Sequence, residues 1–144
     1  MAKIQSIYLI GSLRNPNIPS FANELRTQGF DVFDDWFAPG PETDEYWMKY
    51  EKARGRRYDE ALGGYAAQHV FQFDFEHLQR AEAGVLLAPA GKSGHMELGY
   101  ILGQGKKGFI LFDEEPERWD VMLNFASGVF FDKQLLFAAL KAVA

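Results

Sequence analysis

The sequence predicts an α/β protein, a three-layer α/β/α sandwich around a five-stranded, mainly parallel sheet. Short apolar runs rich in β-formers alternate with longer amphipathic segments, and most of these runs end at Gly, Pro or Asp. The first two runs flank a helix-length segment, and such a β-α-β crossover requires parallel strands. For five strands we expect the flavodoxin-like order 2-1-3-4-5. The 144 residues suit one domain, 1–144.

Each element has a local signal. The first run, IQSIYLI, ends at Gly11, and the helix after it places Phe21, Ala22 and Leu25 on one face and ends before Gly29. The predicted strands cover residues 4–10, 30–33, 84–88, 108–112 and 128–131. The predicted helices cover residues 19–28, 44–68 with a break at Gly63-Gly64, 71–81, 95–102, and 132–143 with Asp132 as N-cap. Residues 36–68 form a helical insert in this scheme.

Composition excludes several classes of protein. The chain has no cysteine, so disulfides, thiolate nucleophiles and zinc–thiolate sites are ruled out. The net charge of −5 argues against a partner that is a nucleic-acid polymer. No apolar run reaches the ~18 residues of a membrane span, and the start at Met1 lacks the pattern of a signal peptide, so we expect a cytoplasmic protein without membrane contact. Aromatic residues make up 15% of the chain, which favours a stacking surface or a subunit interface, or else an aromatic core.

Three familiar binding motifs are incomplete or absent in this sequence. Gly91-Lys92-Ser93 resembles the end of a P-loop, but Leu86 stands where that loop needs its first glycine. Gly11-Ser12-Leu13 lacks the G-x-G-x-x-G pattern of dinucleotide-binding domains. The three histidines have no metal-ligand spacing. We therefore expect no metal and no cofactor.

The most informative stretch is residues 86–105, where a buried strand meets a glycine-rich loop and a helix. Glu97 lies in the first turn of this predicted helix, and the backbone N–H groups of Ser93, Gly94 and His95 point outward at its positive end. The pattern places an anion site next to a reactive carboxylate at the ligand-binding edge of the sheet. The alternative is structural: Gly94 as N-cap and Glu97 as half of a capping box.

At this point the chain resembles a known family. The block S-G-H-M-E-L-G-Y-x-x-G-x-G-K, residues 93–106, is similar to the signature of the nucleoside 2-deoxyribosyltransferase-like superfamily, which includes 2′-deoxynucleoside 5′-monophosphate N-glycosidases and CMP hydrolases. Three other segments agree with it: residues 7–12, the pattern Asp74-x-x-x-Leu78-x-x-Ala81, and residues 85–87. The resemblance extends from residue 4 to about residue 132.

The resemblance implies an enzyme that cleaves an N-glycosidic bond through a covalent glycosyl–Glu97 intermediate. Asp74 would be the second catalytic group and would assist the departing base, although it could instead be a solvated helix carboxylate. The resemblance also implies a homodimer or larger homo-oligomer, in which a neighbouring subunit often completes the pocket. The expected substrate-binding residues are Tyr8, Gly11, Ser12, Asp35, Trp36, Ser93, Gly94, His95 and Asn124.

The substrate that the resemblance implies is a small nucleoside or its 5′-monophosphate. Nucleoside transferases of this family carry an aspartate six residues before the nucleophile, where this chain has Gly91, and the change favours a phosphorylated substrate. A base could stack on Trp36 or Phe37, or these rings could form a hydrophobic lid. Three other functions stay open: a transferase of unphosphorylated nucleosides, an NAD-cleaving domain of the Toll/interleukin receptor type, and a nucleotide-sensing module without turnover.

Overall fold

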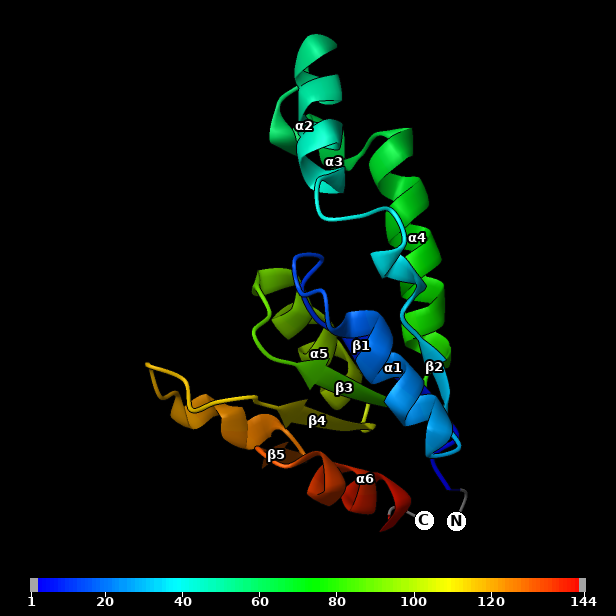
Figure 1. Ribbon diagram of the computed structural model, residues 1–144. Helices are drawn as coiled ribbons and strands as arrows, with labels where there is room; N and C mark the ends of the chain where they lie inside the picture. Colours follow the sequence, from blue (N-terminus) through cyan, green and yellow to red (C-terminus); the bar gives the residue numbers. More distant parts are fainter. Residues whose placement is uncertain (1–2, 143–144) are drawn as a thin grey trace.

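The predicted sheet and strand order are confirmed. The computed structural model describes residues 3–142, and five parallel strands lie in the order β2-β1-β3-β4-β5 (Figure 1). The register places Leu9 beside Val85, and Val85 beside Phe109. All three are at most 4% exposed, as expected for central strands covered on both faces. The strands are β1 (Ser6–Ile10), β2 (Asp31–Phe33), β3 (Ala83–Leu87), β4 (Lys107–Leu111) and β5 (Gly128–Phe130).

Helices cover both faces of the sheet (Figure 1). Side chains alternate along β1, so that Ile7 and Leu9 pack against α1 (Ile18–Thr27) and α6 (Lys133–Ala142). Tyr8 and Ile10 belong to the other half of the core, together with residues of α4 (Tyr65–Arg80) and α5 (Lys92–Gly103). Tyr8 therefore faces the layer that carries the candidate catalytic residues.

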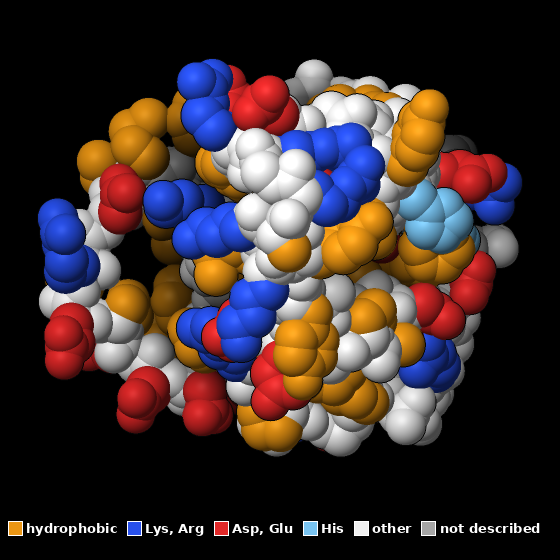
Figure 2. Space-filling view, turned by 90° about the horizontal axis from the view of Figure 1, so that it is seen from above, with side chains coloured by type: hydrophobic (Ala, Val, Ile, Leu, Met, Phe, Trp, Pro, Cys, Tyr) orange, Lys and Arg blue, Asp and Glu red, His pale blue; other side chains and the backbone are white. Residues whose placement is uncertain are grey.

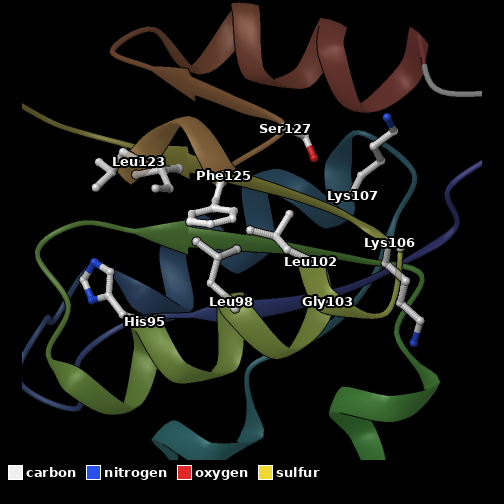
Figure 3. A pocket seen from close by; sticks show the side chains of 12 residues that line it. His95, Leu98, Leu102, Gly103, Lys106, Lys107, Leu123, Phe125 and Ser127 are labelled. Atoms are coloured by element: carbon white, nitrogen blue, oxygen red, sulfur yellow. The ribbon is translucent and has the colours of Figure 1, made fainter. Parts of the chain in front are cut away.

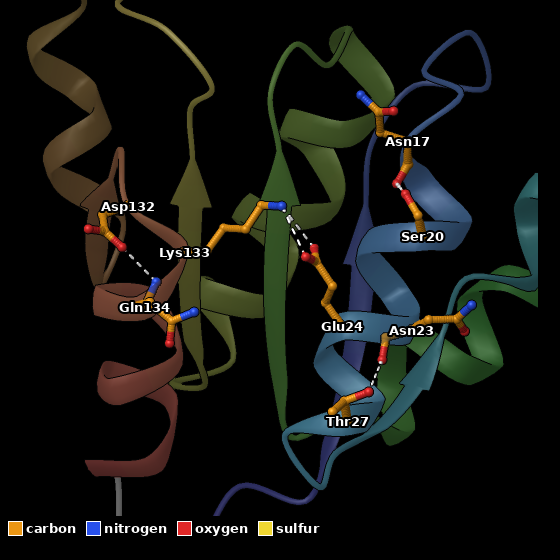
Figure 4. Close-up of polar contacts among 8 residues, drawn as sticks. All are labelled: Asn17, Ser20, Asn23, Glu24, Thr27, Asp132, Lys133 and Gln134. Atoms are coloured by element: carbon orange, nitrogen blue, oxygen red, sulfur yellow. Dashed lines mark hydrogen bonds and ion pairs between the residues drawn. The ribbon is translucent and has the colours of Figure 1, made fainter.

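A hydrogen bond and an ion pair fix α6 (Figure 4). Asp132 accepts a hydrogen bond from the backbone N–H of Gln134 at 2.7 Å, which confirms the predicted capping role of Asp132. Lys133 Nζ contacts both carboxylate oxygens of Glu24 on α1, at 3.0 and 3.1 Å. The predicted last helical residue, Val143, and the start of the chain at Met1 lie outside the described residues.

Two helices, α2 (Thr43–Ala53) and α3 (Tyr58–Leu62), stand away from the sheet beside the N-terminal half of α4 (Figure 1). Short 3-10 turns, η1 (Asp35–Phe37) and η2 (Val121–Phe125), follow β2 and precede β5. Seen from this end, hydrophobic side chains lie exposed among charged ones (Figure 2). None of the helices within residues 3–142 has both the length and the apolar character of a membrane span. The single domain 1–144 with an insert at about 36–68 stays a prediction.

The expected long helix over residues 44–68 is wrong in part. The break at Gly63-Gly64 is confirmed, but a second break separates α2 from α3 at residues 54–57. Gly55 has a φ of +76°, a backbone conformation that glycine adopts without strain and that ends α2. After Gly64 the helix continues to Arg80 without the expected interruption between residues 68 and 71.

The predicted start of α5 is also wrong, and this matters for the site. The helix begins at Lys92 rather than at His95, with Gly91 as its N-cap. Glu97 therefore lies in the second turn, and the interpretation of Gly94 as N-cap with Glu97 as half of a capping box is excluded. Gly94 sits in the first turn, where a Cβ would lie 3.1 Å from both Ile10 Cγ2 and Ala90 Cβ. Its missing side chain lets α5 approach β1 closely.

Candidate active site

Three ionisable side chains from three different elements meet beside the sheet. Tyr8 comes from β1, Asp74 from α4 and Glu97 from α5. The Tyr8 hydroxyl donates a hydrogen bond to Glu97 Oε2 at 2.7 Å. That length is ordinary for a hydrogen bond between two oxygen atoms. The close approach of α5 to β1 at Gly94 makes this contact possible.

The surroundings of the two carboxyl groups raise both pKa values. Burial raises the pKa of Glu97 to about 7, with a further increase from the charge of Asp74, while the Tyr8 hydrogen bond lowers it. Burial raises the pKa of Asp74 to about 6, and neighbouring His77 lowers it. Burial and the Glu97 carboxylate also raise the pKa of Tyr8, so its hydroxyl stays protonated. Two carboxyl groups with pKa values shifted toward neutrality are typical of acid–base or nucleophilic sites.

A cavity of about 480 Å³ opens in front of this pair of carboxyl groups. Its walls come from α2, α3, α4 and α5, so the insert builds one side of it and the sandwich the other. Tyr8 is 1% exposed and packs behind Glu97, so a ligand reaches the Glu97 carboxylate from the cavity side. The lining consists mainly of apolar and aromatic side chains with a few polar groups: Thr43, Asp44, Trp47, Leu62, Ala66, Ala67, Val70, Phe71, Asp74, Phe75, Leu78, Ser93, Met96 and Glu97. This is the usual character of a small-molecule site.

Four of the predicted residues gather at this place. Glu97, Asp74 and Ser93 line the cavity, and Tyr8 holds Glu97. Gly94 belongs to the same turn as Ser93 but is buried against β1. The predicted catalytic pair is thus brought together from positions 23 residues apart in the sequence.

Gly11 and Ser12 follow β1 at the same edge of the sheet as the start of α5 (Figure 1). A Cβ at Gly11 would lie 2.5 Å from Ile18 Cδ1, so close packing against α1 accounts for this glycine. The Ser12 hydroxyl oxygen accepts a hydrogen bond from the backbone N–H of Arg14 at 3.1 Å, which stabilises the turn after β1. Neither residue lines the cavity that contains Glu97.

Asp35 and Trp36 lie in η1, outside this cavity. The Trp36 indole N–H donates a hydrogen bond to the Leu9 carbonyl at 2.7 Å, and the ring packs against both halves of the core. This placement favours the hydrophobic lid over a stacking platform for a base. Asp35 is exposed at the beginning of η1.

His95 and Asn124 lie on the other side of α5. His95 lines a second cavity of about 640 Å³ between α5, β4 and η2 (Figure 3). Its Nδ1 is 2.9 Å from the Gly91 carbonyl oxygen. The side-chain amide of Asn124 donates to the Val121 carbonyl at 2.9 Å within η2. Among residues 3–142, no group of three or more His, Asp or Glu side chains is arranged to hold a metal ion.

Sequence reasoning missed the residues that form the far wall of the cavity. Asp44 and Trp47 lie about 50 positions before Glu97, on a segment that shows no motif. Phe71 and Phe75 lie in the predicted helix over residues 71–81; they line the cavity, and their two rings stack with centroids 5.4 Å apart. The 55% exposure of Phe71 is a signal that only the structure provides.

Comparison with known proteins supports the predicted fold. No protein-family profile and no curated protein sequence matches the chain. Among solved structures, a 2-deoxyribosyltransferase from Bacillus psychrosaccharolyticus has a TM-score of 0.58 and 21% identity, over 94% of this chain and 95% of that chain. A CMP N-glycosidase from Clostridium botulinum has a TM-score of 0.56 and 12% identity, over 94% of this chain and 98% of that chain. The chain thus has the fold of these two proteins, as the resemblance of residues 93–106 implied.

Proposed function

We propose that this chain cleaves the N-glycosidic bond of a (deoxy)nucleoside or its 5′-monophosphate through a covalent glycosyl–Glu97 intermediate, releasing the base to water or exchanging it for another base. The observation that carries the proposal is the pair formed by Glu97 and Asp74 in one cavity, with Tyr8 hydrogen-bonded to Glu97. The shared fold with a 2-deoxyribosyltransferase and a CMP N-glycosidase supports the same class of reaction.

In the first step, an oxygen of ionised Glu97 attacks C1′ of the sugar. The C1′–N bond breaks, and its electron pair stays on the base nitrogen. The carboxylate stabilises the oxocarbenium-like charge at C1′ before it bonds to that atom. The Tyr8 hydroxyl orients the attacking group and favours its ionised form, because its hydrogen bond lowers the pKa of Glu97.

Asp74 acts on the leaving base and then on the incoming group. In its protonated form it donates its proton to the departing base, which leaves neutral, and Asp74 becomes a carboxylate. Water then attacks C1′ and gives a proton back to Asp74, and the Glu97 carboxylate is released. A second base can take the place of water, and the reaction is then a transfer.

The first turn of α5 is the proposed place for a 5′-phosphate. The backbone N–H groups of residues 92–94 lie at the start of α5, and Ser93 lines the cavity. N–H groups at a helix start bind anions, and the turn at Gly11 and Ser12 lies at the same edge of the sheet. The competing candidate is a transferase of unphosphorylated nucleosides. It is favoured by the cavity lining, which within residues 3–142 includes no Lys or Arg.

The test is base release. The protein is incubated with the common nucleosides and their 5′-monophosphates, and free base is measured by chromatography. Glu97→Gln should abolish release, while Glu76→Gln, on the exposed side of α4, should leave it unchanged. A Glu97→Gln variant that keeps more than about a tenth of the activity would contradict the nucleophile, because loss of a nucleophile costs several factors of ten.

Ser93→Ala separates the two substrate classes. If a phosphate binds at the start of α5, this change reduces turnover of the monophosphate far more than turnover of the nucleoside, since hydrogen bonds to charged groups are worth roughly 1.5–3 kcal/mol. Equal or faster turnover of the nucleoside by the unmodified protein would favour the transferase. We also propose a homo-oligomer and, from the sequence, a cytoplasmic location.

A further inference from the structure

The cavity in front of Glu97 is lined by carboxylates on opposite walls. Asp74 and Glu97 come from the sandwich, and Asp44 comes from the first turn of α2. Within residues 3–142, the lining includes no Lys, Arg or His. The nearest basic cluster, which includes Lys52 and Arg56, lines a separate, smaller cavity that shares Trp47 with this one.

The same cavity presents aromatic side chains that are held in place. The Trp47 indole N–H donates to Glu51 Oε2 at 3.2 Å, and Glu51 is 2% exposed. Arg56 lies 3.4 Å from Glu51 Oε1, so this buried carboxylate is fixed and in turn fixes the Trp47 ring. Phe71 and Phe75 stack on each other at the α4 wall. Aromatic faces together with carboxylates favour a flat cation over a neutral or anionic ring.

We propose that this cavity selects substrates whose base carries a positive charge, such as an N7-methylated purine or an N-substituted pyridinium. The inference rests on the proposed function, since it names the class of base that the same site cleaves. A sugar seated with C1′ at Glu97 directs the base into the cavity, between Trp47 and the Phe71–Phe75 pair and toward Asp44 and Asp74.

The chemistry of such a base agrees with the titration of the site. When the C1′–N bond of a cationic base breaks, the bonding pair neutralises the ring, and the base leaves without accepting a proton. Asp74 can then stay ionised through the first step and accept the proton of the attacking water in the second. Burial raises the pKa of Glu97 to about 7 and that of Asp74 to about 6, so near neutral pH the free site can hold a proton on this pair of carboxyl groups. A cation in the cavity lowers both pKa values and expels that proton.

The test compares guanosine with N7-methylguanosine, which differ by one methyl group and one charge. Binding is measured by quenching of tryptophan fluorescence. The Glu97→Gln variant is used so that the greater lability of the glycosidic bond in the methylated nucleoside does not affect the comparison. We expect N7-methylguanosine to bind about tenfold more tightly. Asp44→Asn should reduce this ratio several-fold. Glu45→Gln is the matched control: its carboxylate pairs with Lys49 outside the cavity and should leave the ratio unchanged.

Equal affinity for the two nucleosides, or a ratio that Asp44→Asn leaves unchanged, would overturn the inference. These outcomes are independent of the proposed function. If Glu97→Gln abolishes base release from neutral nucleosides but the two nucleosides bind with equal affinity, the proposed function is supported and the cationic selectivity is contradicted. If Glu97→Gln keeps its turnover, the proposed function fails, and with it this inference about its substrate.

Discussion

The buried hydroxyl of Tyr8 links the core of the sheet to the candidate site. A tyrosine on a central strand brings a large apolar ring into the core, but its hydroxyl needs a partner there. Glu97 is that partner, at 2.7 Å. The orientation of Glu97, the proposed nucleophile, therefore depends on the packing of β1 against α5.

Tyr8→Phe should change the pH dependence more than the fold. The Tyr8 hydrogen bond lowers the pKa of Glu97, so its removal raises that pKa further above its present value of about 7. Less of the nucleophile is then ionised at neutral pH. We expect the acidic limb of the kcat/KM profile to move to higher pH, with much of the lost activity recovered above about pH 8. An unshifted acidic limb would show that Tyr8 does not tune Glu97.

Glu97→Gln should stabilise the fold, and more so at alkaline pH. Burial raises the pKa of Glu97 from 4.5 to about 7. The folded state therefore binds this proton more tightly than the unfolded state, and the associated stability is fully present below about pH 4.5 and is lost as the pH rises through 7. At about 1.36 kcal/mol per pKa unit, ionisation costs up to about 3 kcal/mol.

Neutral glutamine avoids that cost and can still accept the Tyr8 hydrogen bond. The difference in Tm between Glu97→Gln and the unmodified protein should thus be small at about pH 4.5 and several degrees at about pH 8. Glu76→Gln, which removes an exposed partner of Arg80, serves as the control and should show no comparable rise. A constant difference across this range would contradict the linkage to Glu97.

At the scale of elements, the sequence predicted the sheet well because each strand is a short apolar run with a clear end. The starts of helices were harder. Residues 91–94 look like a loop because glycine and serine favour turns, but residues 92–94 form the first turn of α5, where Gly94 packs closely against Ile10. That contact joins residues 84 positions apart, so it could not be predicted from the sequence around either residue.

Gly94→Ala tests the placement of α5. The added Cβ would lie 3.1 Å from Ile10 Cγ2 and Ala90 Cβ, so α5 or these side chains must move by a few tenths of an ångström, and we expect the movement of α5 to carry Glu97 away from Tyr8. We expect kcat/KM to fall several-fold, since about an ångström of displacement costs roughly a hundredfold in well-oriented sites and the shift here is smaller. Gly99→Ala on the same helix is the control, because nothing lies within 4 Å of its Cβ position. It should gain up to about 1 kcal/mol of stability from helix propensity and keep its activity.

The helical insert explains why half of the cavity escaped prediction. The Glu97 wall of the cavity could be predicted, because it belongs to a motif next to a strand. The Trp47 wall depends on a buried carboxylate, Glu51, which contacts Trp47 on α2 and Arg56 in the turn before α3. A glutamate in the charged stretch K-Y-E-K-A-R is expected to be solvated, and its burial depends on the turn at Gly55, which brings Arg56 into contact with it. Long-range packing, rather than composition, builds this wall.

At the scale of the whole molecule, we propose that exposed apolar side chains contact another copy of the chain. Four large ones lie within seven residues around η2: Trp119, Val121, Met122 and Phe125, each at least 57% exposed. Such clusters on a small protein mark interaction surfaces.

We expect light scattering at micromolar concentration to give at least twice the mass of one 16.3 kDa chain. Trp119→Glu combined with Val121→Glu should lower that mass toward the monomer, because charges are depleted from interface cores. Leu135→Glu, at an exposed position on α6, is the control and should leave the mass unchanged. A 16 kDa species for the unmodified protein would exclude the oligomer, while an oligomer that resists both changes near η2 would place the interface elsewhere, with the exposed side chains of α2 to α4 as the next surface to test.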